Sequence, residues 1–276
     1  MAFFHHRSIF PYIDYVLTSK EKKESLDDML QDKCIFYTDS PKDVREKLSN
    51  AKILYIYPDS FDQWTDILLF LHQKKPLSVK LFLLFGSDIS ISYEHMETIF
   101  AFFDKTEFWI QNWTGNHPRA TLLPIGMSDI LPVVDYKKET DLGISFLHHY
   151  IGCEARDDFF VYLHSHPEVL PFCFPKLPFQ KYCQLLAKCN YHTCVMGEGF
   201  DTFRFWESLA LGTVPVVKEH PFYDSIQRQY PIIPMLRLES WFSLLEETQK
   251  EPAAFPHMPF LYEDYWIGKI KTKREI

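Results

Sequence analysis

The sequence predicts an α/β protein made of two Rossmann-like domains that face a central cleft, and three observations support this prediction. Short apolar runs of strand length alternate with helical patterns. The alternation occurs twice, on either side of a charged stretch at residues 132–140 that suits a linker. With 276 residues the chain is long enough for two domains that each bury a core. We therefore expect one domain over residues 1–135 and a second over residues 136–276.

The first domain is predicted from apolar runs rich in Ile, Val, Phe and Leu. Strands are expected at residues 34–37, 53–57, 79–85, 108–110 and 121–125. Helices are expected at residues 40–48, 61–73 and 93–103. Ser40 and Pro41 supply the cap and the first-turn proline of the first of these helices. Strands and helices that alternate in this way are typical of a parallel sheet covered on both faces.

The second domain repeats the alternation after the linker. Strands are expected at residues 142–147, 191–195, 213–217 and 232–233. Helices are expected at residues 154–164, 178–188, 202–211 and 241–249. Aromatic residues near the C-terminus, such as Trp241 and Trp266, are expected to pack in closing helices. The prediction is a second α/β unit of the Rossmann type.

Composition and charge narrow the class of protein. The net charge of −8 argues against a main role in neutralising nucleic-acid phosphates, so no nucleic-acid partner is expected. No export signal is visible, and the apolar runs are too short to cross a bilayer. We expect a soluble, cytoplasmic protein without a transmembrane segment. The basic residues within 269–274 are expected to form a solvated chain end.

Cysteine and histidine spacing gives no sign of a metal site. The six cysteines contain no C-x-x-C pair, so we expect reduced, buried thiols. No group of His and Asp residues has the spacing of metal ligands, and an Asp-x-Asp triplet is lacking. The sequence therefore predicts neither a metal nor a cofactor.

A glycine loop between a predicted strand and a predicted helix is the main functional signal. Gly197 and Gly199 allow the backbone to come close to a ligand. Asp201 can cap the helix that begins near Thr202, and the amides at such a helix start favour a phosphate. Glu198 would lie near that phosphate. The third glycine of a dinucleotide fingerprint is missing, so a plain strand-to-helix turn fits the spacing as well.

Charged residues follow the glycine loop on the predicted helix and the next strand. Arg204 and Glu207 are three residues apart and lie on one helix face. They can form an intrahelical ion pair, or they can share a ligand, with the guanidinium on phosphate oxygens and the carboxylate on ribose hydroxyls. Lys218, at the end of the next strand, can reach a donor phosphate, although a surface role fits it too.

The segment at residues 200–217 reads FDTFRFWESLALGTVPVV. It closely resembles the donor-site signature of exostosin-like glycosyltransferases. The resemblance implies a GT-B fold, in which Glu207 holds the ribose and Arg204 contacts the pyrophosphate. It also implies that Gly197 and Gly199 form the loop beneath the pyrophosphate. Residues 196–198 differ from the family, whose loop contains proline and is less acidic.

Softer similarity to the same family occurs in the first half of the chain. Asp88 follows a predicted strand end, and it is the candidate base that would take the acceptor proton during inverting transfer. As a loop aspartate, Asp88 could instead cap the next helix. Asn112, Asn116 and His117 are candidate acceptor-side residues, although turn formation also explains an Asn in this segment.

These observations lead to one functional hypothesis and three rivals. We expect a glycosyltransferase that moves a sugar from a nucleotide-diphosphate sugar, with uridine or guanosine as the nucleoside, to a glycan or another hydroxyl acceptor, with inversion and without a metal. The rival within enzymes is a retaining transferase, in which Asp88 is not needed as a base. The alternative from another class is a catalytically silent protein of the same fold that binds a nucleotide sugar or a glycan. A Rossmann oxidoreductase is a third reading, and it lacks the full G-x-G-x-x-G fingerprint.

Overall fold

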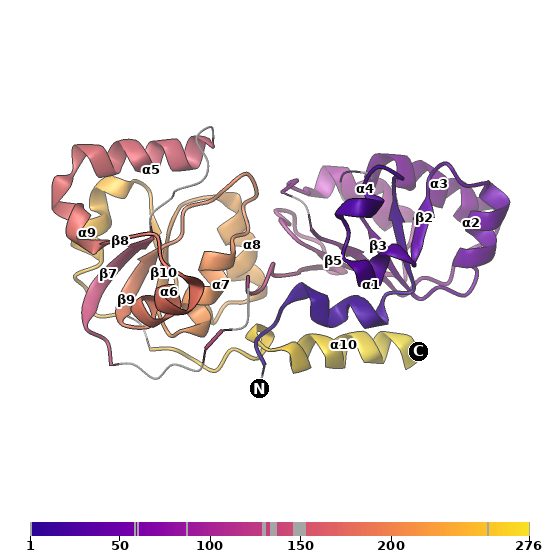
Figure 1. The fold of residues 1–276 in the computed structure, drawn as a ribbon. Helices are drawn as coiled ribbons and strands as arrows, with labels where there is room; N and C mark the ends of the chain where they lie inside the picture. Colours follow the sequence, from indigo (N-terminus) through magenta and orange to yellow (C-terminus); the bar gives the residue numbers. More distant parts are fainter. Residues whose placement is uncertain are drawn as a thin grey trace. The chain divides into compact units, whose positions relative to one another are not determined.

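The computed structural model describes residues 2–57, 59, 61–86, 88–128, 131–132, 137–145, 153–252 and 254–275. The chain forms two compact units (Figure 1). The N-terminal unit comprises His6–Pro124 and Glu263–Ile276. The C-terminal unit comprises Met1–His5 and Ile125–Tyr262. Each unit contains a sheet of parallel strands with helices packed on it, which confirms the predicted α/β class.

The N-terminal unit has a six-stranded parallel sheet in the order β2-β1-β3-β4-β5-β6. Its strands are β1 (Tyr15–Thr18), β2 (Cys34–Phe36), β3 (Ile53–Ile56), β4 (Leu81–Leu84), β5 (Glu107–Ile110) and β6 (Ala120–Leu122). Its longer helices are α2 (Pro41–Leu48), α3 (Phe61–Lys74), α4 (Tyr93–Phe102) and α10 (Glu263–Glu275), beside the short segments η1 (His6–Tyr12), η2 (Lys23–Ser25) and α1 (Asp28–Gln31). All four residues of β3 and of β4 are buried, as expected for strands covered on both faces.

The C-terminal unit has a five-stranded parallel sheet in the order β11-β10-β9-β7-β8. Its strands are β7 (Thr140–Ser145), β8 (Cys173–Phe174), β9 (Cys189–Thr193), β10 (Val214–Lys218) and β11 (Leu236–Leu238). Its helices are α5 (Glu154–Ser165), α6 (Phe179–Leu186), α7 (Phe203–Ala210), α8 (Pro221–Gln229) and α9 (Leu244–Glu247), with the 3-10 segments η4 (Pro167–Phe172), η5 (Trp241–Ser243) and η6 (Pro259–Leu261). Side chains of α5, η5 and α9, including Phe159, Trp241 and Leu244, bury one face of this sheet.

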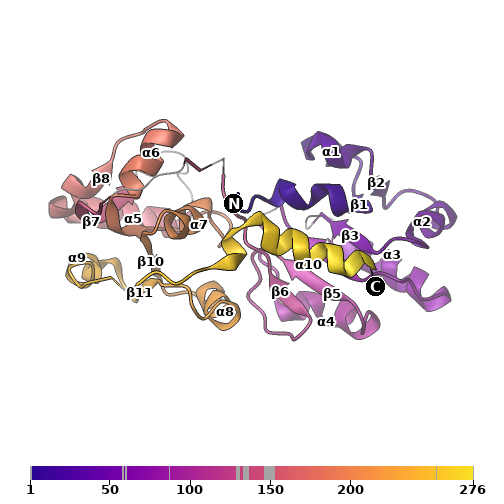
Figure 2. The ribbon, with the colours of Figure 1, turned by 90° about the horizontal axis from the view of Figure 1, so that it is seen from below.

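Each end of the chain belongs to the unit formed mainly by the other half of the sequence. The N-terminal residues belong to the C-terminal unit, and the C-terminal residues belong to the N-terminal unit. Phe4 donates its backbone N–H to the carbonyl of Leu261, at 2.7 Å, within the C-terminal unit. At the other end, α10 lies beside η1 in the N-terminal unit (Figure 2). There, the buried Trp266 contacts Trp109 edge-on, with ring centroids 5.2 Å apart. The predicted domains were residues 1–135 and 136–276. The observed units differ because the boundary lies after Pro124, and because each unit includes a terminal segment that is distant from it in the sequence.

Several predicted elements need correction. The strand expected at residues 232–233 is absent in the described chain, and β11 begins four residues later, because Pro231 and Pro234 flank that pair. The helix expected at residues 241–249 is the short pair η5 and α9. The expected strand at 142–147 is described only as far as Ser145, since residues 146–152 lie outside the described residues.

The basic chain end is not simply solvated. It forms the last turns of α10, where Lys273 pairs with Glu107 and Arg274 pairs with Asp14. The predicted linker, residues 132–140, is described at residue 132 and at residues 137–140. There, the ammonium of Lys138 donates to the carbonyl of Cys189 at 2.7 Å, which ties the linker's end to the C-terminal unit.

The six cysteines form no disulfide, and all six belong to the described part of the chain. Four of the thiols are buried, and those of Cys34 and Cys173 are partly exposed. Burial raises the pKa of Cys194 to about 12, which keeps this thiol protonated. Among the described residues, no helix is long and apolar enough to span a membrane.

Candidate functional site

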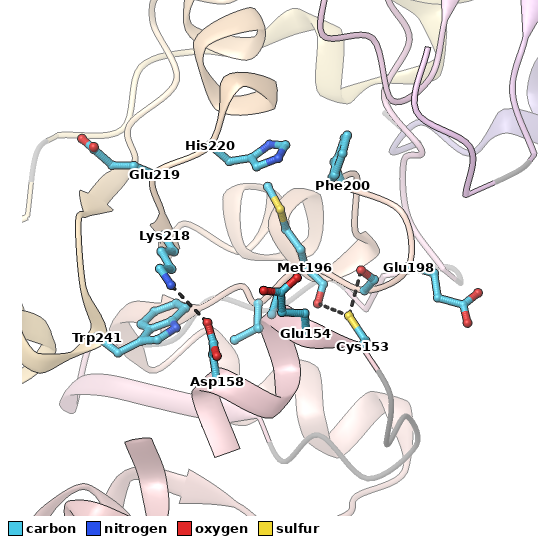
Figure 3. Close-up of a pocket in the computed structure, with 13 residues that line it drawn as sticks. Cys153, Glu154, Asp158, Met196, Glu198, Phe200, Lys218, Glu219, His220 and Trp241 are labelled. Atoms are coloured by element: carbon cyan, nitrogen blue, oxygen red, sulfur yellow. Dashed lines mark hydrogen bonds and ion pairs between the residues drawn. The ribbon is translucent and has the colours of Figure 1, made fainter. Parts of the chain in front are cut away.

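A pocket of about 550 Å³ opens on the C-terminal unit (Figure 3). Four segments line it, and each follows a different strand of the sheet. They are residues 153–158 after β7, 195–200 after β9, 218–220 around the end of β10, and Trp241 after β11. The pocket therefore lies at the carboxyl edge of the parallel sheet, within one unit of the chain.

The strand order places this pocket where ligands bind in open α/β sheets. From β7 the chain passes to β8 on one side, and then to β9, β10 and β11 on the other side. Connections leave the sheet in opposite directions at such a reversal, which opens a crevice between the loops after the two central strands. Residues 153–158 and 195–200 lie on either side of this reversal, so the sheet topology accounts for the hollow.

The glycine loop forms one wall of the pocket and is held by the first turn of α5. The backbone N–H of Gly197 donates to the carbonyl of Gly199 at 3.2 Å, which makes a tight turn. The thiol of Cys153 donates to the carbonyl of Gly197 at 3.0 Å. Arg156 donates from Nε to the carbonyl of Met196 at 3.2 Å. Sequence reasoning missed Cys153 and Arg156, although both lie at the start of a predicted helix that follows a strand.

An ion pair crosses the opposite side of the pocket. Lys218 Nζ lies 3.3 Å from Asp158 Oδ2, and Figure 3 shows this pair beside Trp241. The two side chains are 46% and 54% exposed, so a ligand can reach both. Lys218 was a predicted donor-binding residue, whereas Asp158 and Glu154 were not singled out. Trp241 was expected only to pack, and it lines the pocket as well.

Of the predicted donor-binding residues, Gly197, Glu198 and Lys218 line the pocket. Gly199 lies between two lining residues. The carboxylate of Glu198 points away from the Lys218–Asp158 pair in Figure 3. The remaining four predicted residues do not line the pocket, and they are Asp201, Thr202, Arg204 and Glu207.

Asp201 is bound within the C-terminal unit. Its carboxylate accepts hydrogen bonds from the backbone N–H of Ile125 at 2.7 Å and from the indole N–H of Trp206 at 2.6 Å. Burial raises the pKa of Asp201 to about 7, against the opposing effect of these bonds. The predicted cap is also different, because Thr202 is the N-cap residue of α7. The buried hydroxyl of Thr202 has no hydrogen-bond partner among the residues that the structure describes.

Glu207 is also bound within the unit, although Arg204 is near. The side chain of Glu207 is buried, and its carboxylate accepts hydrogen bonds from the hydroxyl and, at 3.3 Å, the backbone N–H of Ser128. Burial raises the pKa of Glu207, while the Ser128 bonds and the charge of Arg204 lower it. Glu207 therefore anchors the segment that follows β6 in this structure.

The predicted acceptor-side residues belong to the N-terminal unit. Asp88 is exposed and follows β4, and its neighbour Ser87 lies outside the described residues. Asn112 is buried, with a left-handed φ of 53°, two residues after β5. Asn116 is exposed. The structure thus places Asp88 and Asn112 shortly after the neighbouring strands β4 and β5, and Asn116 in the connection from β5 to β6.

His117 has a packing role in the structure. Its ring stacks on Phe100 at 3.9 Å with an interplanar angle of 6°. Its Nδ1 accepts the backbone N–H of Arg119 at 3.3 Å. Burial lowers the pKa of His117, and the Arg119 charge adds to this effect. These contacts explain the residue without a ligand.

Within the described ranges, no group of three or more His, Cys, Asp and Glu side chains could hold a metal ion. In comparisons with known proteins, no family model and no curated protein matches the chain. The chemistry of the pocket is therefore the basis for the function proposed below.

Proposed function

We propose that the chain is a glycosyltransferase of the exostosin-like type with a GT-B fold. It would move a sugar from a nucleotide-diphosphate sugar to a glycan or another hydroxyl acceptor. The observation that supports this proposal is the pocket at the strand-order reversal, walled by the loop that contains Gly197 and Gly199. Nucleotides bind at this position in doubly wound sheets, and the loop leads directly into a helix start.

The proposed donor would lie with its phosphates over the glycine loop. Backbone N–H groups of the loop and of the first turn of α7 would donate to the phosphate oxygens. The guanidinium of Arg204, in that turn, would add positive charge as the diphosphate leaves. In this proposal the protein supplies the positive charge for the leaving group, so transfer needs no metal.

The acceptor chemistry is proposed from the N-terminal unit. Inverting transfer needs a base that removes the acceptor proton as the hydroxyl oxygen attacks the anomeric carbon. The exposed carboxylate of Asp88 is the candidate base, and Asn112 and Asn116 are the candidate acceptor contacts. His117 is a weaker candidate because Phe100 and Arg119 already engage its ring.

A silent binding protein of the same fold is the second candidate, and one observation favours it. The carboxylates of Asp201 and Glu207 are bound by N–H and O–H groups of the C-terminal unit. In that state Glu207 cannot offer all its acceptor positions to a ribose. Transfer would require Glu207 to exchange Ser128 for the ribose, whereas a binding protein could hold its ligand in the pocket alone.

One experiment separates these candidates. The chain would be incubated with a panel of nucleotide-diphosphate sugars, and release of the nucleoside diphosphate would be measured with and without hydroxyl acceptors and with excess EDTA. Release that persists in EDTA supports metal-independent transfer. Binding of a nucleotide sugar in calorimetry without release identifies the silent protein. If no nucleotide sugar binds, the transferase and a silent nucleotide-sugar-binding protein are both refuted, and only a glycan-binding protein is left.

A further inference from the structure

We propose that the pocket selects a guanine base, so that the donor is a guanosine-diphosphate sugar. This inference rests on the proposed function, because it assigns the nucleotide within the same pocket. It depends on the ion pair between Lys218 and Asp158 and on the acidic side chains around it.

The ion pair presents a short row of hydrogen-bonding groups to the pocket. The ammonium of Lys218 offers donors only, and the carboxylate of Asp158 offers two acceptor oxygens. Because Nζ lies 3.3 Å from Oδ2, one donor stands beside two acceptors. Both side chains are about half exposed, so a base edge can approach the pair without opening the core.

The Watson–Crick edge of guanine has the complementary order of groups. O6 accepts a hydrogen bond, and N1–H and the 2-amino group next to it each donate one. Lys218 would donate to O6, and the two oxygens of Asp158 would accept from N1–H and the amino group. All three bonds involve a charged partner, and the two bonds to the carboxylate are parallel.

The other bases match this row less well. Adenine offers one acceptor and one amino donor, so it satisfies two of the three positions. Uracil has one donor between two carbonyls, so one carbonyl would face a carboxylate oxygen. Cytosine has two adjacent acceptors, and one of them would face the carboxylate in the same way. A buried or partly buried acceptor that faces another acceptor loses its hydrogen bond to water without replacement.

The rest of the pocket favours a base that donates hydrogen bonds. Besides Asp158, the acidic residue Glu154 lines it, against the one ammonium of Lys218 among the described lining residues. Trp241 lies beside the ion pair and offers an aromatic surface to a base (Figure 3). The volume of about 550 Å³ is within the range of nucleotide-sized sites. An acceptor-rich, aromatic pocket fits guanine better than a pyrimidine with two carbonyls.

Calorimetric titration of the full chain with GDP, IDP, ADP, UDP and CDP tests this proposal. We expect GDP to bind at least about 10-fold more tightly than UDP or CDP. IDP lacks only the 2-amino group, so we expect its affinity to be roughly 10-fold below that of GDP. The five ligands have the same ribose and diphosphate and differ only in the base. Differences between their affinities therefore report recognition of the base by the unaltered protein.

Two variants assign the preference to residues. Asp158→Asn should weaken the binding of GDP roughly 10- to 100-fold and the binding of UDP less than about 3-fold, because only guanine uses both carboxylate oxygens. Glu219→Gln is the matched control, since it removes the same charge from a lining residue whose carboxylate points away from the pair (Figure 3). It should leave the GDP preference unchanged.

The outcomes separate this inference from the proposed function. Equal binding of the five diphosphates, or a preference for UDP, overturns the guanine assignment and leaves a nucleotide-sugar site. Equal binding of GDP and IDP also overturns it, because the 2-amino contact is then absent. If none of the diphosphates binds, the guanine assignment and the proposed function both fail.

Discussion

The two units share the order of their central strands and differ at the carboxyl edges of their sheets. In both, the first strand lies between the second and the third, as β2-β1-β3 in one unit and β8-β7-β9 in the other. In the N-terminal unit, Tyr55 stacks on Phe85 at 4.3 Å and donates its hydroxyl to the Phe85 carbonyl at 2.8 Å, and Phe10 stacks on the same ring. In the C-terminal unit, the edge holds the pocket.

The comparison shows that both sheets have the same kind of strand edge, and that different side chains stand at the strand ends. Large rings fill space at the end of β3 and β4. The loop after β9 instead carries glycines held by main-chain contacts to Cys153 and Arg156. Substitutions that act on one unit and spare the other test this comparison.

The largest expected effect comes from two buried tryptophans, one in each unit. Trp109→Ala removes the side chain that contacts Trp266 and should lower the free energy of unfolding by about 3–5 kcal/mol. Trp241→Ala removes a ring that packs 4.6 Å from Phe159 and also lines the pocket. Urea denaturation should show a loss for both, whereas calorimetry should show weaker nucleotide binding for Trp241→Ala alone. Unchanged nucleotide affinity in that variant would remove Trp241 from the ligand site.

The next effect concerns the buried carboxylate of Asp201 in the C-terminal unit. Asp201 has a pKa raised from 3.8 to about 7, so the folded state holds its proton to higher pH than the unfolded state. Its contribution to stability is present below pH 4 and is lost as pH rises through 7. His192, whose pKa burial lowers from 6.5 to about 3, acts in the opposite direction over an overlapping range.

Asp201→Asn removes the first of these contributions. The free energy of unfolding should then rise more steeply with pH between pH 4 and 6.5, by up to about 1.4 kcal/mol per pH unit. Urea denaturation at several pH values, with the unaltered chain measured beside the variant, gives this slope. An identical slope in the two proteins would show that Asp201 is ionised throughout the range.

A smaller effect distinguishes two glycines that follow strands. Gly86 in the N-terminal unit has a φ of +80°, and an added Cβ would lie 3.0 Å from the hydroxyl oxygen of Tyr55. Gly86→Ala should therefore cost about 1–2 kcal/mol. At Gly197, the three described atoms nearest to an added Cβ belong to the end of the Arg156 side chain, the first at 2.7 Å. Gly197→Ala should change stability by less than about 0.5 kcal/mol in the same thermal-melting series. A larger loss at Gly197 than at Gly86 would show that the end of Arg156 cannot move away from the added Cβ.

The smallest effect is expected at the ion pair in the pocket. Lys218→Met breaks a contact between half-exposed side chains, so the free energy of unfolding should change by less than about 0.5 kcal/mol. The same variant should weaken GDP roughly 10-fold or more if Lys218 contacts the base. Thermal melting and calorimetry on one preparation compare the two quantities. A clear loss of stability would make the pair structural.

The sequence predicted the layered α/β class because burial on both faces leaves long apolar runs such as those of β3 and β4. It did not predict β1 or β8. β1 has four residues and is separated from the apolar segment of η1 by two residues, and β8 has two residues, so neither gives a run that stands out. Residues that contact each other across the fold but lie far apart in the chain also leave no local pattern in the sequence.

The sequence also predicted only part of the candidate site, namely the residues that lie next to predicted strands. Gly197, Glu198 and Lys218 stand next to strands that periodicity reveals, and the carboxyl ends of parallel strands meet at one edge. Asp158 is 60 residues from Lys218 in the chain, so their pairing appears only in the folded unit. The engagement of Glu207 by Ser128 likewise joins segments that no spacing rule connects.

The packing of α10 has a consequence for the order in which the two units receive their segments during synthesis. Residues 263–275 belong to the unit whose sheet is translated first, and Trp266 is buried against it. The C-terminal unit has all of its segments once Tyr262 has left the ribosome. Because Ile125–Tyr262 lies between that sheet and Trp266 in the chain, the nascent sheet must wait through the synthesis of this segment with the Trp266 position uncovered.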